Sequence, residues 1–221
     1  MRNTNYSIAI DGPAGAGKST VAKRIATILN LEYIDTGAMY RALTLKVMRN
    51  GKDPQNMDEV IQVFKDTTID FNNNHIYLDG EIVDKEIRDN EINKNVSYIA
   101  IIKEVREGMV SLQQEMAKTK SVIMDGRDIS TVVLTNAEFK FFVTASPEER
   151  ARRRYKELRE NGKTDITLEQ IIGEIERRDY IDSNREIAPL KLADDAILIN
   201  TDNLSIEEVV NKIIRIVEGG N

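Results

Sequence analysis

The sequence contains no cysteine and no tryptophan, and His75 is the single histidine among its 221 residues. The absence of cysteine excludes disulfides, thiolate metal sites and cysteine nucleophiles. A single histidine argues against histidine-rich zinc sites and against Ser-His-Asp hydrolysis in its usual form. The composition fits a reducing compartment.

Long apolar runs are also missing. No segment approaches the ~20 apolar residues that span a bilayer, and residues 1–11 lack the apolar stretch of a secretory signal. We therefore expect a cytoplasmic protein without a membrane partner. The chain has 31 Lys and Arg against 37 Asp and Glu, a net charge of −6, which argues against nucleic acid as a partner. Its length favours one domain, or one domain with an insert, and we expect a monomer.

Strand-like and helix-like segments alternate along most of the chain, which predicts an α/β fold with a parallel core sheet flanked by helices. Helical periodicity runs through 18–30, and a second helix is expected over 37–49. Capping patterns at Ser146, Thr167 and Ser205 mark three later helix starts. The expected core strands are 6–11, 31–35, 121–125, 139–144 and 196–200.

One stretch interrupts this alternation and predicts a small antiparallel sheet inserted at about residues 60–90. Its short strand candidates are 67–71, 75–78 and 81–83. Asn72-Asn73-Asn74 separates the first two, and Asp79-Gly80, a strong hairpin signal, separates the last two. A helix over about 92–118 should lead back to the core.

Residues 12–19 read Gly-Pro-Ala-Gly-Ala-Gly-Lys-Ser and match G-x-x-x-x-G-K-[ST] in full. A strand candidate precedes the motif and a helix candidate follows it, as a phosphate-binding loop requires. Glycines let the backbone N–H groups wrap around a phosphate, and the helix presents its positive end to the same anion. Lys18 would reach the β- and γ-phosphates, and Ser19 would ligate Mg²⁺. We expect Gly12, Pro13, Ala14, Gly15, Ala16, Gly17, Lys18, Ser19 and Thr20 to bind ATP.

Two carboxylates lie at the end of the apolar strand at 121–125 or just after it. Asp125 ends it, at the usual position of the acidic Mg²⁺ partner in phosphate-loop proteins, whether it binds directly or through water. Asp128 lies three residues later and suits either metal binding or recognition. No general base is evident in the sequence. A phosphate monoester acceptor needs none, because it is already ionised near neutral pH, so we favour phosphate as the nucleophile.

Eight of the sixteen arginines lie between 150 and 185, which is unexpected in an acidic chain. Phosphoryl transfer brings two polyphosphates together, and arginine offsets their repulsion with a permanent charge and a planar fork of donors. We interpret residues 151–160 (ARRRYKELRE), taken as a block, as facing phosphates. For Arg150 and Arg159 we favour surface ion pairs with nearby glutamates instead.

Several segments together resemble bacterial cytidylate kinases over nearly the whole chain, in order. They are IAIDGPAGAGKST, DTGAMYRAL, VREGMVSLQQ, DGRDISTVV, ERRDYIDSNREIAPL and AILINTDNLSIEEVV. The resemblance implies a P-loop kinase fold that transfers a phosphoryl group from ATP to CMP or dCMP with Mg²⁺. It divides the chain into a core (1–59, 91–149 and 186–221), a nucleoside-monophosphate-binding insert (about 60–90) and a helical lid with the following helix (about 150–185).

The resemblance also implies roles for individual residues. Thr36, Arg106 and Asp128 would contact cytosine, whereas Ser97, Arg178 and Asp182 would lie near the sugar. Arg41, Arg127 and Arg185 would hold the acceptor phosphate. Lys18, Arg127, Arg185 and Arg154 from the lid would act in catalysis, and Ser19 with Asp125 would hold the metal. Thr36 departs from the serine that the family often has, which leaves the contact of its hydroxyl open.

Other P-loop proteins remain alternatives on the residues alone. A kinase for another nucleotide or small metabolite shares most of the features above. A GTP-binding switch would need a guanine-selecting NKxD, and Asp202-Asn203 is a poor substitute. A motor or regulatory ATPase fits the small size and compact insert less well.

Overall fold

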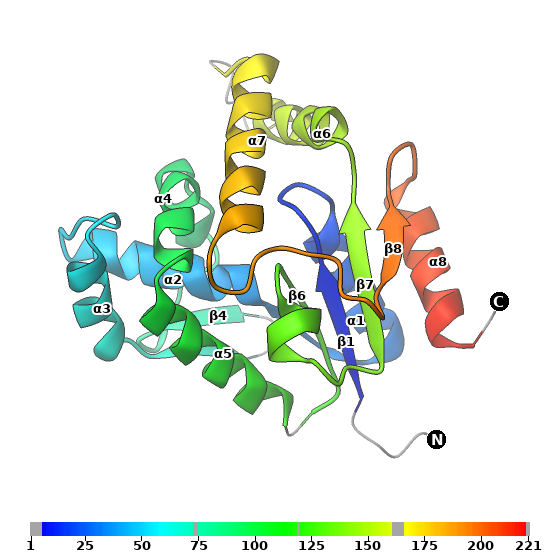
Figure 1. Cartoon of the computed structure of the whole chain (residues 1–221), viewed down its shortest axis with the longest axis horizontal. Coiled ribbons are helices and arrows are strands. Elements are labelled where there is room, and N and C mark those ends of the chain that lie inside the picture. The colour runs from blue at the N-terminus through cyan, green and yellow to red at the C-terminus, as the bar shows by residue number, and fades with distance from the viewer. Residues whose placement is uncertain (1–5, 73–74, 119, 161–165, 220–221) are drawn as a thin grey trace.

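The computed structural model describes residues 6–72, 75–118, 120–160 and 166–219 (Figure 1). Within these ranges, five strands form a parallel sheet in the order β2-β6-β1-β7-β8. The strands are β1 (Ser7–Asp11), β2 (Glu32–Asp35), β6 (Val122–Gly126), β7 (Phe139–Thr144) and β8 (Ile197–Asn200). All five lie where the alternating pattern predicted them, so the parallel α/β core is confirmed.

A second, antiparallel sheet consists in the described residues of β3 (Ile69–Asn72), β4 (His75–Leu78) and β5 (Glu81–Ile82). Its second turn has the left-handed backbone that an Asp-Gly hairpin requires, with φ of 50° at Asp79 and 87° at Gly80. The predicted small sheet is therefore confirmed. The first predicted turn includes Asn73 and Asn74, which lie outside the described residues.

Helices cover both sheets, and three of them start at the predicted capping residues Ser146, Thr167 and Ser205. Thr167 and Ser205 each form a complete capping box, with Gln170 and Glu208. The helices are α1 (Lys18–Leu29), α2 (Thr36–Arg49), α3 (Met57–Lys65), α4 (Asn90–Ala100), α5 (Lys103–Ala117), α6 (Pro147–Glu160), α7 (Leu168–Asn184) and α8 (Ile206–Val217). A 3₁₀ turn (Glu86–Arg88) precedes α4, and a π-helical turn (Ile129–Val133) follows β6. Across the described ranges, none of the helices combines the length and apolar character of a bilayer span.

The prediction of one helix over 92–118 is wrong, because α4 and α5 are separate. Ile102 adopts extended backbone angles between them, with φ −71° and ψ 123°. The carbonyl of Ala100, at the end of α4, instead accepts a hydrogen bond of 3.0 Å from the Arg106 guanidinium. Ile99 and Ile102 are both buried, so the break lets both side chains enter the core. Tertiary packing therefore overrides the helical periodicity here.

The core lies on the two faces of the parallel sheet. Ile8 and Ile10 of β1 pack in one cluster with residues of α1 and α8, whereas Ala9 packs in the other, with residues of α2, α5 and the small sheet. A third, separate cluster joins Ala151 and Leu158 of α6 to residues of α7. These two helices thus share a hydrophobic cluster of their own, and Figure 1 shows them above the carboxyl ends of the core strands.

Candidate active site

The segment between β1 and α1 forms the phosphate loop that the motif predicted. Gly12, Gly15 and Gly17 have φ values of 146°, 77° and 88°, which only glycine adopts without strain. A Cβ at Gly12 would lie 1.9 Å from the carbonyl oxygen of Val143 on β7. The close approach of loop and strand therefore requires glycine at this position.

Lys18, the first residue of α1, is buried in this loop, and its Nζ donates a hydrogen bond of 2.8 Å to the carbonyl of Pro13. Burial lowers the pKa of Lys18 to about 7, and the nearby Arg127 guanidinium acts in the same direction. The Asp125 carboxylate opposes this shift. Because its surroundings disfavour the charged form of Lys18, an anion bound beside the ammonium would be stabilising.

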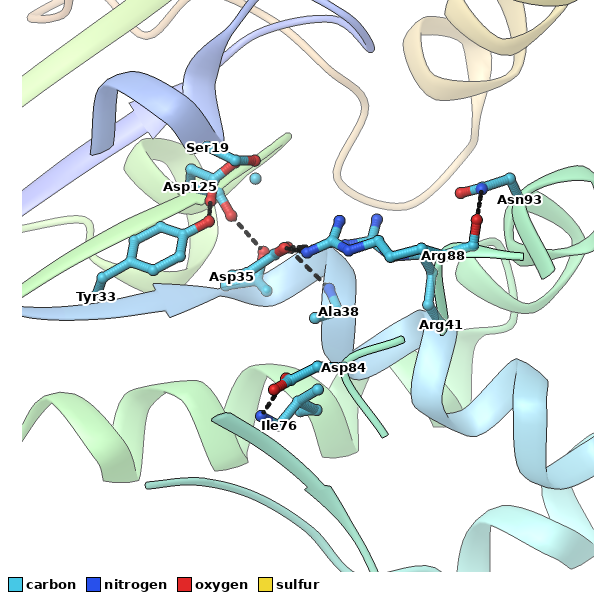
Figure 2. A network of polar contacts seen from close by, with 12 residues as sticks. Ser19, Tyr33, Asp35, Ala38, Arg41, Ile76, Asp84, Arg88, Asn93 and Asp125 are labelled. Atoms are coloured by element: carbon cyan, nitrogen blue, oxygen red, sulfur yellow. Dashed lines mark hydrogen bonds and ion pairs between the residues drawn. The ribbon is translucent and has the colours of Figure 1, made fainter. Parts of the chain in front are cut away.

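Asp125 lies buried on β6 beside the loop, as predicted, and its two oxygens have different partners. Oδ2 accepts from the Ser19 hydroxyl at 2.9 Å, and Oδ1 accepts from the Tyr33 hydroxyl at 2.7 Å (Figure 2). Burial raises the pKa of Asp125. The hydroxyl and carboxylate oxygens of Ser19 and Asp125 are hard donors that suit Mg²⁺. Sequence reasoning missed Tyr33, because no motif marks the middle of β2.

Asp35 is the centre of a second cluster, where β2 ends and α2 begins (Figure 2). It caps α2 by accepting from the Ala38 N–H at 2.8 Å. Both its oxygens also accept from Arg41, at 3.1 and 2.9 Å, and Arg88 donates to it at 2.9 Å. Burial acts to raise the pKa of Asp35, but the two guanidinium groups outweigh it and hold the pKa at about 2. Arg41 was predicted in the site, whereas Arg88 was not.

A third cluster joins residues from three distant parts of the chain around Asp128. The Arg106 guanidinium on α5 donates to one oxygen of this buried carboxylate. Arg185, just after α7, lies 3.5 Å from the other oxygen and donates from Nε to the carbonyl of Ala188 at 2.7 Å. The Arg106 guanidinium carbon also lies 6.0 Å from the centre of the Tyr40 ring. The structure thus brings together two of the three residues expected at cytosine.

Arg127, Arg178 and Asp182 form the fourth cluster, between the end of β6 and α7. Arg127 Nε donates to the Asp182 carboxylate at 2.7 Å. Burial lowers the pKa of Arg178 to about 10, and Arg127 adds to the shift. Among the described residues, the buried Nε of Arg178 has no hydrogen-bond partner. A buried guanidinium nitrogen with a free donor is costly and suits an anionic ligand.

Thr36, Ser97 and Arg154 are the remaining predicted residues. Thr36, at the start of α2, donates from its hydroxyl to the carbonyl of Asp125 at 2.8 Å, so this hydroxyl is bonded to β6. Ser97 is buried on α4. Arg154 on α6 pairs with Glu157 at 2.8 Å.

The interpretation of Arg150 as a surface residue is wrong. Its side chain is buried, and it bonds to the phosphate loop and to α7 rather than to a glutamate on its own helix. The i,i+4 pattern could not reveal this, because Asp179 lies 29 residues away in sequence.

Sequence reasoning also missed Asp11, the last residue of β1. Its buried carboxylate accepts from the N–H groups of Ile129 and Ser130, both at 2.8 Å, and from the Ser130 hydroxyl. Burial raises the pKa of Asp11 against these bonds. Since Asp128 directly precedes these residues, Asp11 fixes the segment that carries Arg127 and Asp128.

Comparison with solved structures supports the fold alone. A crystal structure of an uncharacterized protein from Eubacterium ventriosum has a TM-score of 0.53 at 12% identity, covering 97% of this chain and 99% of that one. Shikimate kinase from Bacteroides thetaiotaomicron has a TM-score of 0.50 at 14% identity, covering 96% and 98%.

Sequence comparison is more specific. The family model described as Cytidylate kinase matches residues 8–219. The cytidylate kinase of Clostridioides difficile (strain 630) is 54% identical over 210 residues, which are 95% of this chain and 97% of that protein. That of Alkaliphilus oremlandii (strain OhILAs) is 54% identical over 212 residues, 96% of this chain and 97% of that one. The chain therefore belongs to the cytidylate kinase family.

Proposed function

We propose that this protein transfers the γ-phosphoryl group of ATP to the phosphate of CMP, giving ADP and CDP, and that dCMP is a second acceptor. One observation carries the proposal. Lys18 of the phosphate loop lies near Arg127, which follows β6, and near Arg178 of α7. Asp128 follows β6 as well, and it is buried in a pair with Arg106 of α5. A donor triphosphate and an acceptor phosphate would meet between these groups.

The donor side rests on the phosphate loop. Its backbone N–H groups and Lys18 would hold the β- and γ-phosphates, and the pairing of Ser19 with Asp125 supports these two as the metal-binding residues. Mg²⁺, when bound there, supplies charge neutralisation for the phosphates. The residues from Gly12 to Thr20 would together form the ATP-binding loop.

The acceptor side rests on arginine. Arg41, Arg127 and Arg185 would hold the acceptor phosphate, which attacks as a dianion and so needs no general base. Lys18, Arg127, Arg185 and the lid residue Arg154 would stabilise the charge on the transferred group. The Lys18 ammonium and the three guanidinium groups are donors that suit the equatorial oxygens that carry this charge.

Cytosine recognition would rest on Asp128 and Arg106, with Thr36 beside them. The cytosine amino group is a donor that a carboxylate accepts, and its ring nitrogen and carbonyl are acceptors that suit a guanidinium. Uracil reverses two of these preferences and would leave buried polar groups unpaired. Ser97, Arg178 and Asp182 would lie near the sugar.

A coupled assay with Mg·ATP across CMP, dCMP, UMP, AMP and shikimate tests the proposal. We expect the highest kcat/KM with CMP or dCMP. The Lys18→Ala variant should keep its fold by circular dichroism and lose at least about a hundredfold in kcat, because it lacks the charge at the phosphates. Highest activity with AMP or shikimate, or full activity of Lys18→Ala, would contradict the proposal.

A further inference from the structure

The guanidinium of Arg150 joins three separate parts of the molecule, one through each of its nitrogens. Nε donates to the carbonyl of Ala145, which follows β7, at 3.0 Å. Nη1 donates to the carbonyl of Ala14 in the phosphate loop at 3.0 Å. Nη2 donates to the carboxylate of Asp179 on α7 at 2.6 Å. The side chain is 3% exposed, so solvent contributes little to holding it.

This arrangement depends on the shape of a guanidinium. Its donors lie in one rigid plane and point in different directions, so they reach three acceptors at once, whereas a lysine ammonium acts as a compact point charge. Gly15 contributes to the contact, because a Cβ at this position would lie only 3.3 Å from the Arg150 Cβ. The phosphate loop and α6 are therefore in close contact as well as hydrogen bonded.

The link to α7 reaches the acceptor side of the site. Asp179 directly follows Arg178 in α7, and Asp182 lies about one turn further along the same helix. Asp182 pairs with Arg127. A displacement of α7 relative to the phosphate loop would therefore move Arg178 and Asp182 relative to Lys18.

We propose that Arg150 is a positioning residue that ties the phosphate loop to α7 and so sets the distance between the donor and acceptor sites. This inference rests on the proposed function, since it assigns the acceptor nucleotide to the α7 side. Arg150 would touch neither nucleotide, because its side chain is buried among these protein contacts. Its effect would reach the reaction through Arg178 and Asp182.

Variants of Arg150 and Asp179 test the two arms of this link separately, namely the bond from Arg150 to Ala14 and the bond from Arg150 to Asp179. In Asp179→Ala, the Arg150 bond to Ala14 remains and the bond to α7 is lost. We expect kcat/KM for CMP to fall about tenfold to a hundredfold, as for the loss of a hydrogen bond to a charged group, with KM for ATP changed less than about twofold. Arg150→Gln should raise KM for ATP as well, because it loses both arms.

The double variant tests whether one connection carries both effects. Combining Asp179→Ala with Arg150→Gln should lower kcat/KM for CMP no further than Arg150→Gln alone does, because the connection is already broken. Arg159→Gln is the matched control, since Arg159 lies exposed near the end of α6, and it should behave as wild type. If Arg150→Gln does not fold, Asp179→Ala alone carries the test.

Hydrogen exchange gives a readout that is independent of activity. Amides of residues 178–184 in α7 should exchange faster in Asp179→Ala than in wild type, while those of β1 and β6 keep their protection. Provided that the wild type is active, three results would overturn the role of Arg150. They are unchanged CMP kinetics in Asp179→Ala, equal losses for ATP and CMP in Asp179→Ala, and losses in the double variant that multiply those of the single variants. A wild type inactive on CMP would instead reject the proposed function.

Discussion

Binding of a triphosphate should make this protein take up a proton at mildly alkaline pH, and Lys18 should be the group that gains the proton. In the chain alone, burial and the nearby Arg127 lower the pKa of Lys18 to about 7. A polyphosphate placed against the ammonium stabilises its charged form and raises the pKa again. The protonated fraction of Lys18 must therefore rise on binding.

The size of the uptake follows from the pKa. At pH 8, one unit above a pKa of about 7, only about a tenth of Lys18 is protonated, so binding should take up about 0.9 proton. At pH 7 the uptake should be about half a proton. The phosphate groups contribute little at pH 8, because their last pKa is about 6. The same shift makes unfolding more costly as pH rises from 7 towards 10, since the unfolded chain binds more protons there.

Isothermal titration calorimetry measures the uptake directly. Titrating a non-hydrolysable ATP analogue with Mg²⁺ at pH 8, in buffers of different ionisation enthalpy, gives the number of protons from the slope of the observed enthalpy. Lys18→Arg is the control, because a guanidinium keeps its proton at this pH and should reduce the uptake to near zero. A wild-type uptake near zero at pH 8, or an unchanged uptake in Lys18→Arg, would refute the reasoning.

Three further substitutions test single contacts of the site. Gly12→Ala should destabilise the fold by about 4 kcal/mol or more, measured by urea unfolding, because its Cβ would overlap the Val143 carbonyl; a loss below about 1 kcal/mol would contradict the loop geometry. Asp128→Ala should lower the CMP/UMP ratio of kcat/KM at least about tenfold while KM for ATP stays near wild type; an unchanged ratio would remove Asp128 from cytosine recognition. Tyr33→Phe should cost about 1–3 kcal/mol of stability, since it deprives the buried Asp125 of a donor, and a neutral result would show that the bond contributes nothing.

The fold was largely predictable because its signals are local. Each of these signals depends on residues that are close in sequence. They are the strand and helix periodicity, the capping residues and the Asp79-Gly80 turn. The break between α4 and α5 was not predictable in this way. No glycine or proline marks residues 100–102, and the carbonyl of Ala100 at the break accepts a hydrogen bond from the Arg106 guanidinium. A helix end that is determined by a tertiary contact leaves no local pattern.

The same distinction separates the parts of the site. Lys18 and Ser19 belong to a continuous motif, and Asp125 ends an apolar strand, so a pattern points to each of them. Tyr33 and Arg88 lie in segments without a motif. They enter the site because β2 pairs with β6 and because the turn before α4 packs beside Asp35. Their positions follow from the topology of the sheets, which the sequence does not state residue by residue.

The arginines show what physical reasoning adds once the partners are known. Burying a guanidinium is costly unless a carboxylate accompanies it, and the partners come from distant elements. Arg127 pairs with Asp182, which lies 55 residues away in sequence, and Arg150 pairs with Asp179, which lies 29 residues away. The clusters nevertheless keep more cations than carboxylates. Asp35 and Asp128 each form ion pairs with two arginines. Lys18 and Arg178 add further positive charge, and the pKa of each is lowered. A folded protein that tolerates such an excess gives up stability for it, and a pair of polyphosphates is the kind of ligand that restores the balance.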